Sequence, residues 1–554
     1  MSSSPRILIV GGVAGGASAA ARARRLSEAA SIVVFERGPY VSFANCGLPY
    51  HIGGVITDRG RLLLQTPASL KARFEIDVRV NTEVMAIDAA AKEVVVRNLM
   101  TGVESRERYD ALVLSPGADA IQPPIPGVKN ERIFTLRNMG DMDAILAKVS
   151  KPGVARALVV GAGYIGLELA EQFRHRGLEV ALVERLPHVL GVADAEMTFP
   201  LHEELARQGV DLRLERAVAS FAAGEGQGLV AILDNGARIA CDLAVLSVGV
   251  KPETRLARAA GLALGQTGGI LVDDQMRTSD PSIYAVGDAV EVSEFVSGDQ
   301  AMIPLAGPAN RQGRIAADVI CGRDSHFRGV QGTAICGVFD IAAASTGASE
   351  KALQRAGVTD YEKIYLHPNH HVGYYPGAKA INLKLIFCKS DGRILGAQAV
   401  GEADVARRID VIATAIQFGG TVYDLEESEL CYAPQFGGAK DPVNFAGMIA
   451  SNALRGDNPL ADWSQLGADG AFLLDVRDPD EFEEGHIPGA VNLPLNELRA
   501  RMGELPRERE ISIYCGVGQR AYYATRILLQ NGYDAKNLAG GIRTYKQIAP
   551  TKRT

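Results

Sequence analysis

A strand, a glycine-rich turn and an alanine-rich helix occur twice in this chain, about 150 residues apart, in residues 7–25 and 157–168. Each copy is followed by a second apolar segment that ends in an acid, Glu36 after the first and Glu184 after the second. This order is typical of a βαβ unit that binds a dinucleotide. The repeat therefore predicts an α/β chain with two dinucleotide folds, one inserted in the other.

The second copy carries the complete G-x-G-x-x-G pattern at Gly161, Gly163 and Gly166, with Tyr164 and Ile165 between the last two glycines. These glycines permit a tight turn, close approach of a pyrophosphate and close packing of the helix on the strand. The first amides of the helix then face the phosphates. Glu184 is placed to bind a ribose 2′-hydroxyl, which favours NADH over NADPH, although the neighbouring Arg185 weakens that preference.

The first copy departs from the pattern at one position, because Val13 stands where the second glycine is expected. Glu36 still ends the next strand correctly for binding an adenosine ribose. We expect the turn to bind a dinucleotide through Gly11, Gly12, Val13, Ala14 and Gly15.

Composition narrows the function classes. The 554 residues correspond to three or four domains. The net charge of −7 argues against a nucleic-acid binder, which needs a concentrated basic face. No apolar run approaches a membrane span and no signal peptide opens the chain. Seven cysteines are too few, and odd in number, for a disulfide scaffold, so we expect a cytoplasmic protein without a membrane partner.

A third segment, residues 278–288, ends in Gly287 and Asp288. It resembles the second FAD motif of the two-dinucleotide flavoprotein disulfide reductases, in which the aspartate binds a ribityl hydroxyl. The resemblance covers about residues 6–450 and implies that Ser115, Pro116, Gly117 and Gly249 form the crossover turns. It further implies FAD contacts at Arg37, Asn45, Leu305, Ala306 and Phe436.

Cys46 lies in residues 42–50, directly after the first nucleotide unit. Dithiol reductases carry a second cysteine five positions on, where this chain has His51. Cys46 is therefore expected to act alone, through a mixed disulfide, a sulfenic acid or a persulfide. We expect a neighbouring flavin and a helix N-terminus to lower its pKa.

Residues 42–50 are similar to the signature of the coenzyme A disulfide reductases. NADH oxidases and peroxidases also use one cysteine, but they carry a histidine early in the first helix, and residues 13–28 contain none. The resemblance implies a homodimer in which Tyr374 and Tyr432 flank the sulfur in the partner's site and a phenol protonates the departing thiolate. The implied CoA contacts are Arg25, Ser42, Phe43, Lys71 or Arg73, Asn310 and Arg314 of one subunit, with Lys440 across the dimer.

The last 80 or so residues resemble a rhodanese domain, through residues 475–477, 486–490 and 512–520. The six-residue loop from Cys515 to Arg520 resembles that of sulfur-transferring members. Such a loop points its amides inward and would stabilise a thiolate or persulfide on Cys515, with Arg520 adding charge. Gly516 and Val517 depart from the common Arg-Ser, which leaves the sulfur donor open. An inert binding module is the alternative.

Three histidines, His367, His370 and His371, lie in a proline-containing loop without a cysteine or carboxylate cluster, so we expect no metal site.

Together these features resemble a coenzyme A disulfide reductase fused to a rhodanese domain. The expected parts are an FAD domain (1–120 and 250–330), an NAD domain (121–249), an α+β dimerisation domain (331–450), a linker (451–466) and an α/β rhodanese domain (467–554). The implied function is NADH-dependent reduction of CoA persulfide, polysulfide and CoA disulfide, with FAD as cofactor and CoA bound tightly. The alternatives are an NADH oxidase or peroxidase, and a redox-sensing flavoprotein whose rhodanese module only binds partners.

Overall fold

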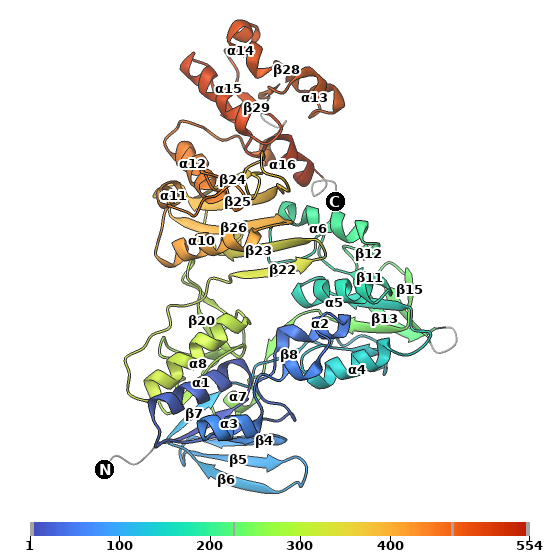
Figure 1. The fold of residues 1–554 in the computed structure, drawn as a ribbon, viewed down its shortest axis with the longest axis vertical. Helices are drawn as coiled ribbons and strands as arrows, with labels where there is room; N and C mark the ends of the chain where they lie inside the picture. Colours follow the sequence, from blue (N-terminus) through green and yellow to red (C-terminus); the bar gives the residue numbers. More distant parts are fainter. Residues whose placement is uncertain (1–4, 225–227, 467–469, 550–554) are drawn as a thin grey trace. The chain divides into compact units, whose positions relative to one another are not determined.

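The computed structural model describes residues 5–224, 228–466 and 470–549, and its chain divides into two compact units (Figure 1). One unit comprises the chain up to Val183 together with Arg216–Gly332, and the other comprises Glu184–Glu215 and the chain from Thr333 onward. Within the described ranges, no helix is both long and apolar enough to cross a lipid bilayer.

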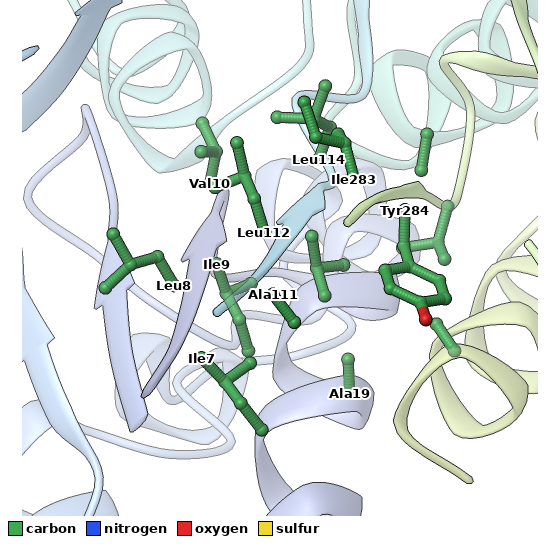
Figure 2. Packing of buried hydrophobic residues seen from close by; sticks show 14 of the residues in the cluster. Ile7, Leu8, Ile9, Val10, Ala19, Ala111, Leu112, Leu114, Ile283 and Tyr284 are labelled. Atoms are coloured by element: carbon green, nitrogen blue, oxygen red, sulfur yellow. The ribbon is translucent and has the colours of Figure 1, made fainter. Parts of the chain in front are cut away.

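The first dinucleotide fold is a five-stranded parallel sheet in the order β19-β7-β1-β2-β3. Its strands are β1 (Arg6–Val10), β2 (Ser31–Phe35), β3 (Asp77–Arg79), β7 (Ala111–Leu114) and β19 (Ile283–Ala285). All but the edge strand β3 are almost wholly apolar because a parallel sheet buries both faces. Figure 2 shows side chains of β1, β7 and β19 gathered with Ala19 of α1 (Ala14–Leu26). The carboxyl ends of β1 and β19 thus carry the first glycine turn and Asp288.

The second dinucleotide fold repeats this plan. Its strand β10 (Arg156–Val160) pairs in parallel with β11 (Glu179–Val183) on one side and β16 (Leu243–Leu246) on the other. The helix α5 (Tyr164–His175) follows β10. The two folds are joined where β8 (Ala118–Ala120) pairs antiparallel with β17 (Val250–Pro252), and these strands begin directly after Gly117 and Gly249 of the predicted crossover turns.

The second unit contains a five-stranded antiparallel sheet in the order β22-β23-β26-β25-β24. Its strands are β22 (Ala334–Val338), β23 (Ile341–Gly347), β24 (Tyr361–Leu366), β25 (Ile381–Cys388) and β26 (Ile394–Gly401). Helices α10 (Val405–Gln417) and α12 (Pro442–Leu454) belong to the same region. Every residue of β25 and β26 is buried, so these two strands form the centre of the domain.

A four-stranded parallel sheet, ordered β28-β27-β29-β30, closes the chain. Its strands are β27 (Phe472–Asp475), β28 (Val491–Asn492), β29 (Ile511–Tyr514) and β30 (Ala535–Asn537). Its helices are α13 (Pro479–Glu484), α14 (Leu495–Arg501), α15 (Gln519–Gln530) and α16 (Gly541–Ile548). The predicted fold class, with two nested dinucleotide folds, an α+β domain and a terminal α/β domain, is confirmed.

The predicted linker, residues 451–466, has structure at both ends. Helix α12 continues to Leu454, and Trp463 is buried, with its indole nitrogen donating to the carbonyl of Ala539 at 2.9 Å. Leu460 pairs with Asn537 as an isolated parallel bridge. The latter half of the predicted linker is therefore packed on the terminal domain, whose predicted start at residue 467 lies outside the described residues.

Candidate functional site

The two glycine turns have matching geometry. Gly11 and Gly161 have φ of 91° and 98°, in the region that only glycine adopts easily. A Cβ on Gly16 would lie 1.9 Å from the carbonyl oxygen of Gly11, and one on Gly166 would lie 1.9 Å from that of Gly161. Gly16, the last glycine of the first turn, is therefore the counterpart of Gly166, although the expected dinucleotide contacts ended at Gly15.

The residues of both turns fit a bound dinucleotide. A Cβ on Gly163 would meet no described atom within 4 Å, so the backbone at the start of α5 is open to a ligand. Neither α1 nor α5 has a side-chain cap, which leaves their first amides available for phosphate. The Glu36 carboxylate accepts hydrogen bonds from the amides of Gly12 (2.9 Å) and Gly38 (2.8 Å), which fixes it at the end of β2. Glu184 accepts from the amide of Leu186 at 2.8 Å.

Asp288 follows β19 through a turn in which Gly287 has φ of 83°. Burial raises the pKa of its carboxyl group, against the opposing charge of Arg137. The Arg137 guanidinium lies beside the crossover turn, 2.5 Å from where a Cβ on Gly117 would stand. A half-buried carboxylate next to a cation and two glycine turns suits the ribityl and phosphate groups of FAD. Arg137 was not predicted, because it belongs to no recognisable motif.

Cys46 lies in a 3-10 turn, Asn45–Gly47, directly before α2 (Leu48–Gly53), and is exposed to solvent. Desolvation by its surroundings, together with the charges of Glu168 and Asp288, raises the pKa of the thiol. The expected lowering is therefore absent from the polypeptide itself. Two nearby acids disfavour the thiolate, and any lowering must come from bound groups.

Glu168 is the second residue that sequence reasoning missed. It lies one turn into α5, and burial raises the pKa of its carboxyl to about 7. The Tyr50 hydroxyl donates to Glu168 Oε1 at 3.3 Å, and Tyr50 lies on α2, four residues after Cys46. Glu168 thus connects the second glycine fingerprint to the segment that carries Cys46. The glycine pattern explains why its glycines are needed, but it gives no reason to single out Glu168.

Tyr374 and Tyr432 lie together, with their hydroxyl oxygens 3.1 Å apart. Their position beside the reacting sulfur of a partner subunit stays a prediction. Both are exposed, at 75% and 48%. Two arginines of α10 hydrogen-bond to the loops that carry these two tyrosines. Arg408, fully buried, donates to the carbonyl of His370 at 2.6 Å, and Arg407 donates to the carbonyl of Phe436 at 2.6 Å.

Several of the predicted CoA contacts of the first unit lie on helices, whereas Ser42 and Phe43 lie in the segment before Cys46. Arg25 is exposed in the last turn of α1, and Asn310 and Arg314 are exposed on α8 (Ala306–Ile320), which packs on α1. Ser18 donates to Asn310 at 2.5 Å. Of the pair on α3 (Pro67–Phe74), Lys71 is bonded to Glu75, and Arg73 is exposed without a described partner. Lys440 is exposed in the second unit.

Cys515 follows β29 and is 1% exposed. The amide of Gly518, which has φ of 99°, donates to Cys515 Sγ at 3.2 Å. The carbonyl of Cys515 accepts from the amide of Ile542 at 2.8 Å, and that of Gly516 accepts from Arg543 at 3.2 Å. The start of α16 therefore holds the loop, and an inward amide faces the sulfur as the sequence predicts.

Arg520 lies close enough to Cys515 for the two charges to interact, and two acids also hold its guanidinium. Its guanidinium donates to both carboxylate oxygens of Glu481, at 2.6 and 2.8 Å, and to Asp478 at 3.3 Å. The pairing lowers the pKa of Glu481, mainly through the bond to Arg520. Glu481 and Asp478 belong to α13 and its first cap, and neither was predicted.

The three histidines do not form a metal site. His367 hydrogen-bonds Asn382 (2.7 Å) and Thr544 of α16 (2.8 Å), and burial lowers its pKa to about 3. The one described group with metal-like spacing is Asp194, Glu196 and Glu350. The Lys384 ammonium, fully buried, contacts all three carboxylates and so neutralises the cluster as an ion would.

Family models match three parts of the chain: pyridine nucleotide-disulphide oxidoreductase over residues 5–313, the dimerisation domain of that family over 333–441, and a rhodanese-like domain over 460–548. The chain belongs to the pyridine nucleotide-disulphide oxidoreductase family.

Among curated relatives, coenzyme A disulfide reductases of Staphylococcus epidermidis and Staphylococcus aureus are 35% and 36% identical over 446 and 449 residues. Each comparison covers 80% of this chain and at least 99% of the relative. The predicted resemblance to coenzyme A disulfide reductases is thereby confirmed.

Two solved structures match the whole chain, rhodanese domain included. The reduced CoADR-RHD of Bacillus anthracis is 47% identical, with a TM-score of 0.96 and 99% of both chains covered. An NAD-dependent persulfide reductase from A. fulgidus is 37% identical, with a TM-score of 0.90, over 98% of this chain and 100% of that one. A water-forming NADH oxidase from Lactobacillus brevis is 29% identical, with a TM-score of 0.78, over 82% of this chain and 99% of that one.

Proposed function

We propose that this protein is an NADH-dependent reductase of CoA persulfide and CoA disulfide, with Cys46 as the redox residue and Cys515 as the entry point for sulfur. The observation that carries the proposal is the presence, in one chain, of a lone thiol beside a dinucleotide turn and a second thiol in an amide-lined rhodanese loop. Relatives named for CoA disulfide and persulfide reduction match the chain over most or all of its length.

The chemistry at Cys46 balances for both substrates. With a disulfide, the thiolate attacks one sulfur, the S–S bond breaks, and CoA thiolate leaves with the electron pair. With CoA persulfide, attack on the inner sulfur releases hydrosulfide and forms the same Cys46–CoA disulfide. Bound FAD would supply the relay of two electrons from NADH that reduces this disulfide to two thiolates.

The remaining residues have supporting roles in this proposal. Tyr374 or Tyr432, supplied by the partner of a homodimer, protonates the departing CoA thiolate. Cys515, once it carries a sulfane sulfur, transfers it to the CoA thiolate, which regenerates CoA persulfide for Cys46. Tight binding of CoA makes this cycle efficient, and a cytoplasmic location suits free thiols. A monomer that retains full activity would contradict the assignment of the tyrosines.

The test is anaerobic, and it follows NADH consumption and sulfide release with CoA persulfide, glutathione persulfide and CoA disulfide in parallel. Cys46→Ser is expected to abolish all NADH-linked reduction, by more than 100-fold, because serine forms no disulfide. Cys515→Ser is expected to spare reduction of CoA disulfide and to lower sulfide release from glutathione persulfide. Cys321→Ser, at a free cysteine outside both sites, is the matched control.

Three outcomes would contradict the proposal. An NADH oxidase or peroxidase would stall without oxygen or peroxide, although α1 lacks the histidine typical of those enzymes. A redox sensor would show no multiple turnover. Unchanged sulfide release in Cys515→Ser would remove the sulfur relay and leave the reductase.

A further inference from the structure

The opening of the Cys515 loop has an unusual charge distribution for a site that would take up sulfur. The side chains between Cys515 and Arg520 are those of Gly516, Val517, Gly518 and Gln519, and none of them is charged. Val517 is exposed at 43%. Any charge that an incoming donor meets must therefore come from Arg520 and from the residues around it.

Arg520 is close to the loop, since its Nη2 lies 3.6 Å from where a Cβ on Gly516 would stand. It is the one cation that the loop itself contributes, and two acids hold it. Glu481 binds it through two parallel hydrogen bonds, the strong geometry for a guanidinium and a carboxylate, and Asp478 adds a third contact. The three groups together carry a net charge of −1.

Two further arginines belong to the same domain. Arg477 is buried and paired with Asp475 at 2.7 Å. Arg543 is partly buried, its amide donates to the carbonyl of Gly516 at 3.2 Å, and its side chain interacts with the charge of Glu203. The group of Arg520, Glu481 and Asp478, with its net negative charge beside the loop, would therefore repel a small anion that approaches Cys515.

We propose that the Arg520–Glu481 pair selects the sulfur donor, excluding inorganic oxyanion donors such as thiosulfate and admitting thiol persulfides whose reacting end carries no oxyanion. This inference rests on the proposed function and specifies the chemical class of the sulfur donor. The pantetheine arm of CoA is uncharged and apolar in part, so it can pass an opening lined by Gly516 and Val517 with its phosphates held far outside.

The transfer is balanced for either donor. With a persulfide, Cys515 thiolate attacks the outer sulfur, the donor S–S bond breaks, and the donor thiolate leaves with the electron pair, so that Cys515 becomes a persulfide. With thiosulfate the same attack would release sulfite. The two donors differ in the charge that approaches the loop, because thiosulfate carries two negative charges on a small ion.

The test compares sulfur transfer to cyanide from thiosulfate and from pantetheine persulfide, using the full-length protein. Glu481→Gln keeps the shape of the side chain and its bond to the amide of Asp478 but removes one charge. We expect kcat/KM for thiosulfate to rise about tenfold and that for pantetheine persulfide to change less than twofold. In the unmodified protein, raising the salt concentration should increase kcat/KM for thiosulfate, because the repulsion is screened.

Glu483→Gln is the matched control, since Glu483 is an exposed acid on the same helix without a described contact to Arg520. If Glu481→Gln leaves thiosulfate transfer unchanged, or lowers transfer from both donors equally, the pair is merely structural and the inference is wrong. Absence of transfer from either donor in all variants also overturns it. Failure of NADH-linked reduction of CoA persulfide, by contrast, would overturn the proposed function and leave the donor selectivity standing.

Discussion

Cys46 and Cys515 are both free thiols, but they differ in solvent exposure and in the groups that surround the sulfur. Cys46 is exposed, and the acids Glu168 and Asp288 help to raise its pKa. Cys515 is buried and receives a hydrogen bond from the amide of Gly518. The first thiol depends on bound groups to become reactive, whereas a backbone amide and the charge of Arg520 both act on the second. Reactivity at Cys46 is therefore conditional on its ligands, which suits a reductase that would otherwise lose electrons to the wrong oxidant.

The largest expected effect is a loss of activity at Cys515 that leaves the Cys46 site active. Gly541 has φ of 63°, and a Cβ there would lie 2.2 Å from the carbonyl oxygen of Cys515. Gly541→Val is expected to abolish sulfur transfer by Cys515 and to destabilise the rhodanese domain by about 3 kcal/mol or more. Fluorescence of Trp463, the one tryptophan of the chain, reports unfolding of this region.

Cys46-dependent reduction of CoA disulfide should change less than twofold in Gly541→Val. The control is Gly503→Ala in the same domain, where an added Cβ meets nothing within 4 Å among the described atoms. If CoA disulfide reduction falls together with sulfur transfer, the two sites are not independent.

Lowering the pH should reduce the free energy of unfolding of the region that holds the Cys515 loop. His367 is partly buried and neutral, because desolvation lowers its pKa from 6.5 to about 3, and it bonds Thr544 of the helix that holds the loop. The unfolded chain takes up a proton below about pH 6.5 and the folded one does not, so the free energy of unfolding falls as pH drops from 6.5 toward 3. The slope from this group approaches about 1.4 kcal/mol per pH unit.

His367→Gln removes this titration and should flatten the pH dependence measured by Trp463 fluorescence. Burial also lowers the pKa of His202, to about 4, so part of the slope will remain. His370→Gln, at a partly exposed neighbour, should leave the slope as it is. An unchanged slope in His367→Gln would show that the buried imidazole does not control the acid response.

Sequence reasoning found the features that are defined by closely spaced residues. The glycine turns, Cys46 and Cys515 each follow from short spacings that a turn or a loop requires. It missed the groups that tune them, because these come from other segments: Glu168 lies 118 residues from the Tyr50 to which it bonds, and Glu481 lies 39 residues from Arg520. Local spacing cannot place such partners. Short spacing could therefore place the charge of Arg520 near Cys515, but it could not show the acids that also hold it.

The smallest predicted effect concerns the tuning of Cys46 itself. Glu168→Gln removes an acid that raises the pKa of the thiol, so that pKa should fall. The pH profile of Cys46 alkylation, followed by mass spectrometry of the peptide that contains it, should shift to lower pH. The shift should be seen only above about pH 7, because below that value Glu168 is itself protonated.

Glu171→Gln provides the control, since Glu171 lies on the same helix but is not among the charges that act on Cys46. An alkylation profile that is unmoved in Glu168→Gln would mean that desolvation alone holds the thiol protonated. The contrast between the two cysteines would then be one of solvation, and bound ligands would activate Cys46 by changing its burial rather than by balancing the charge of Glu168.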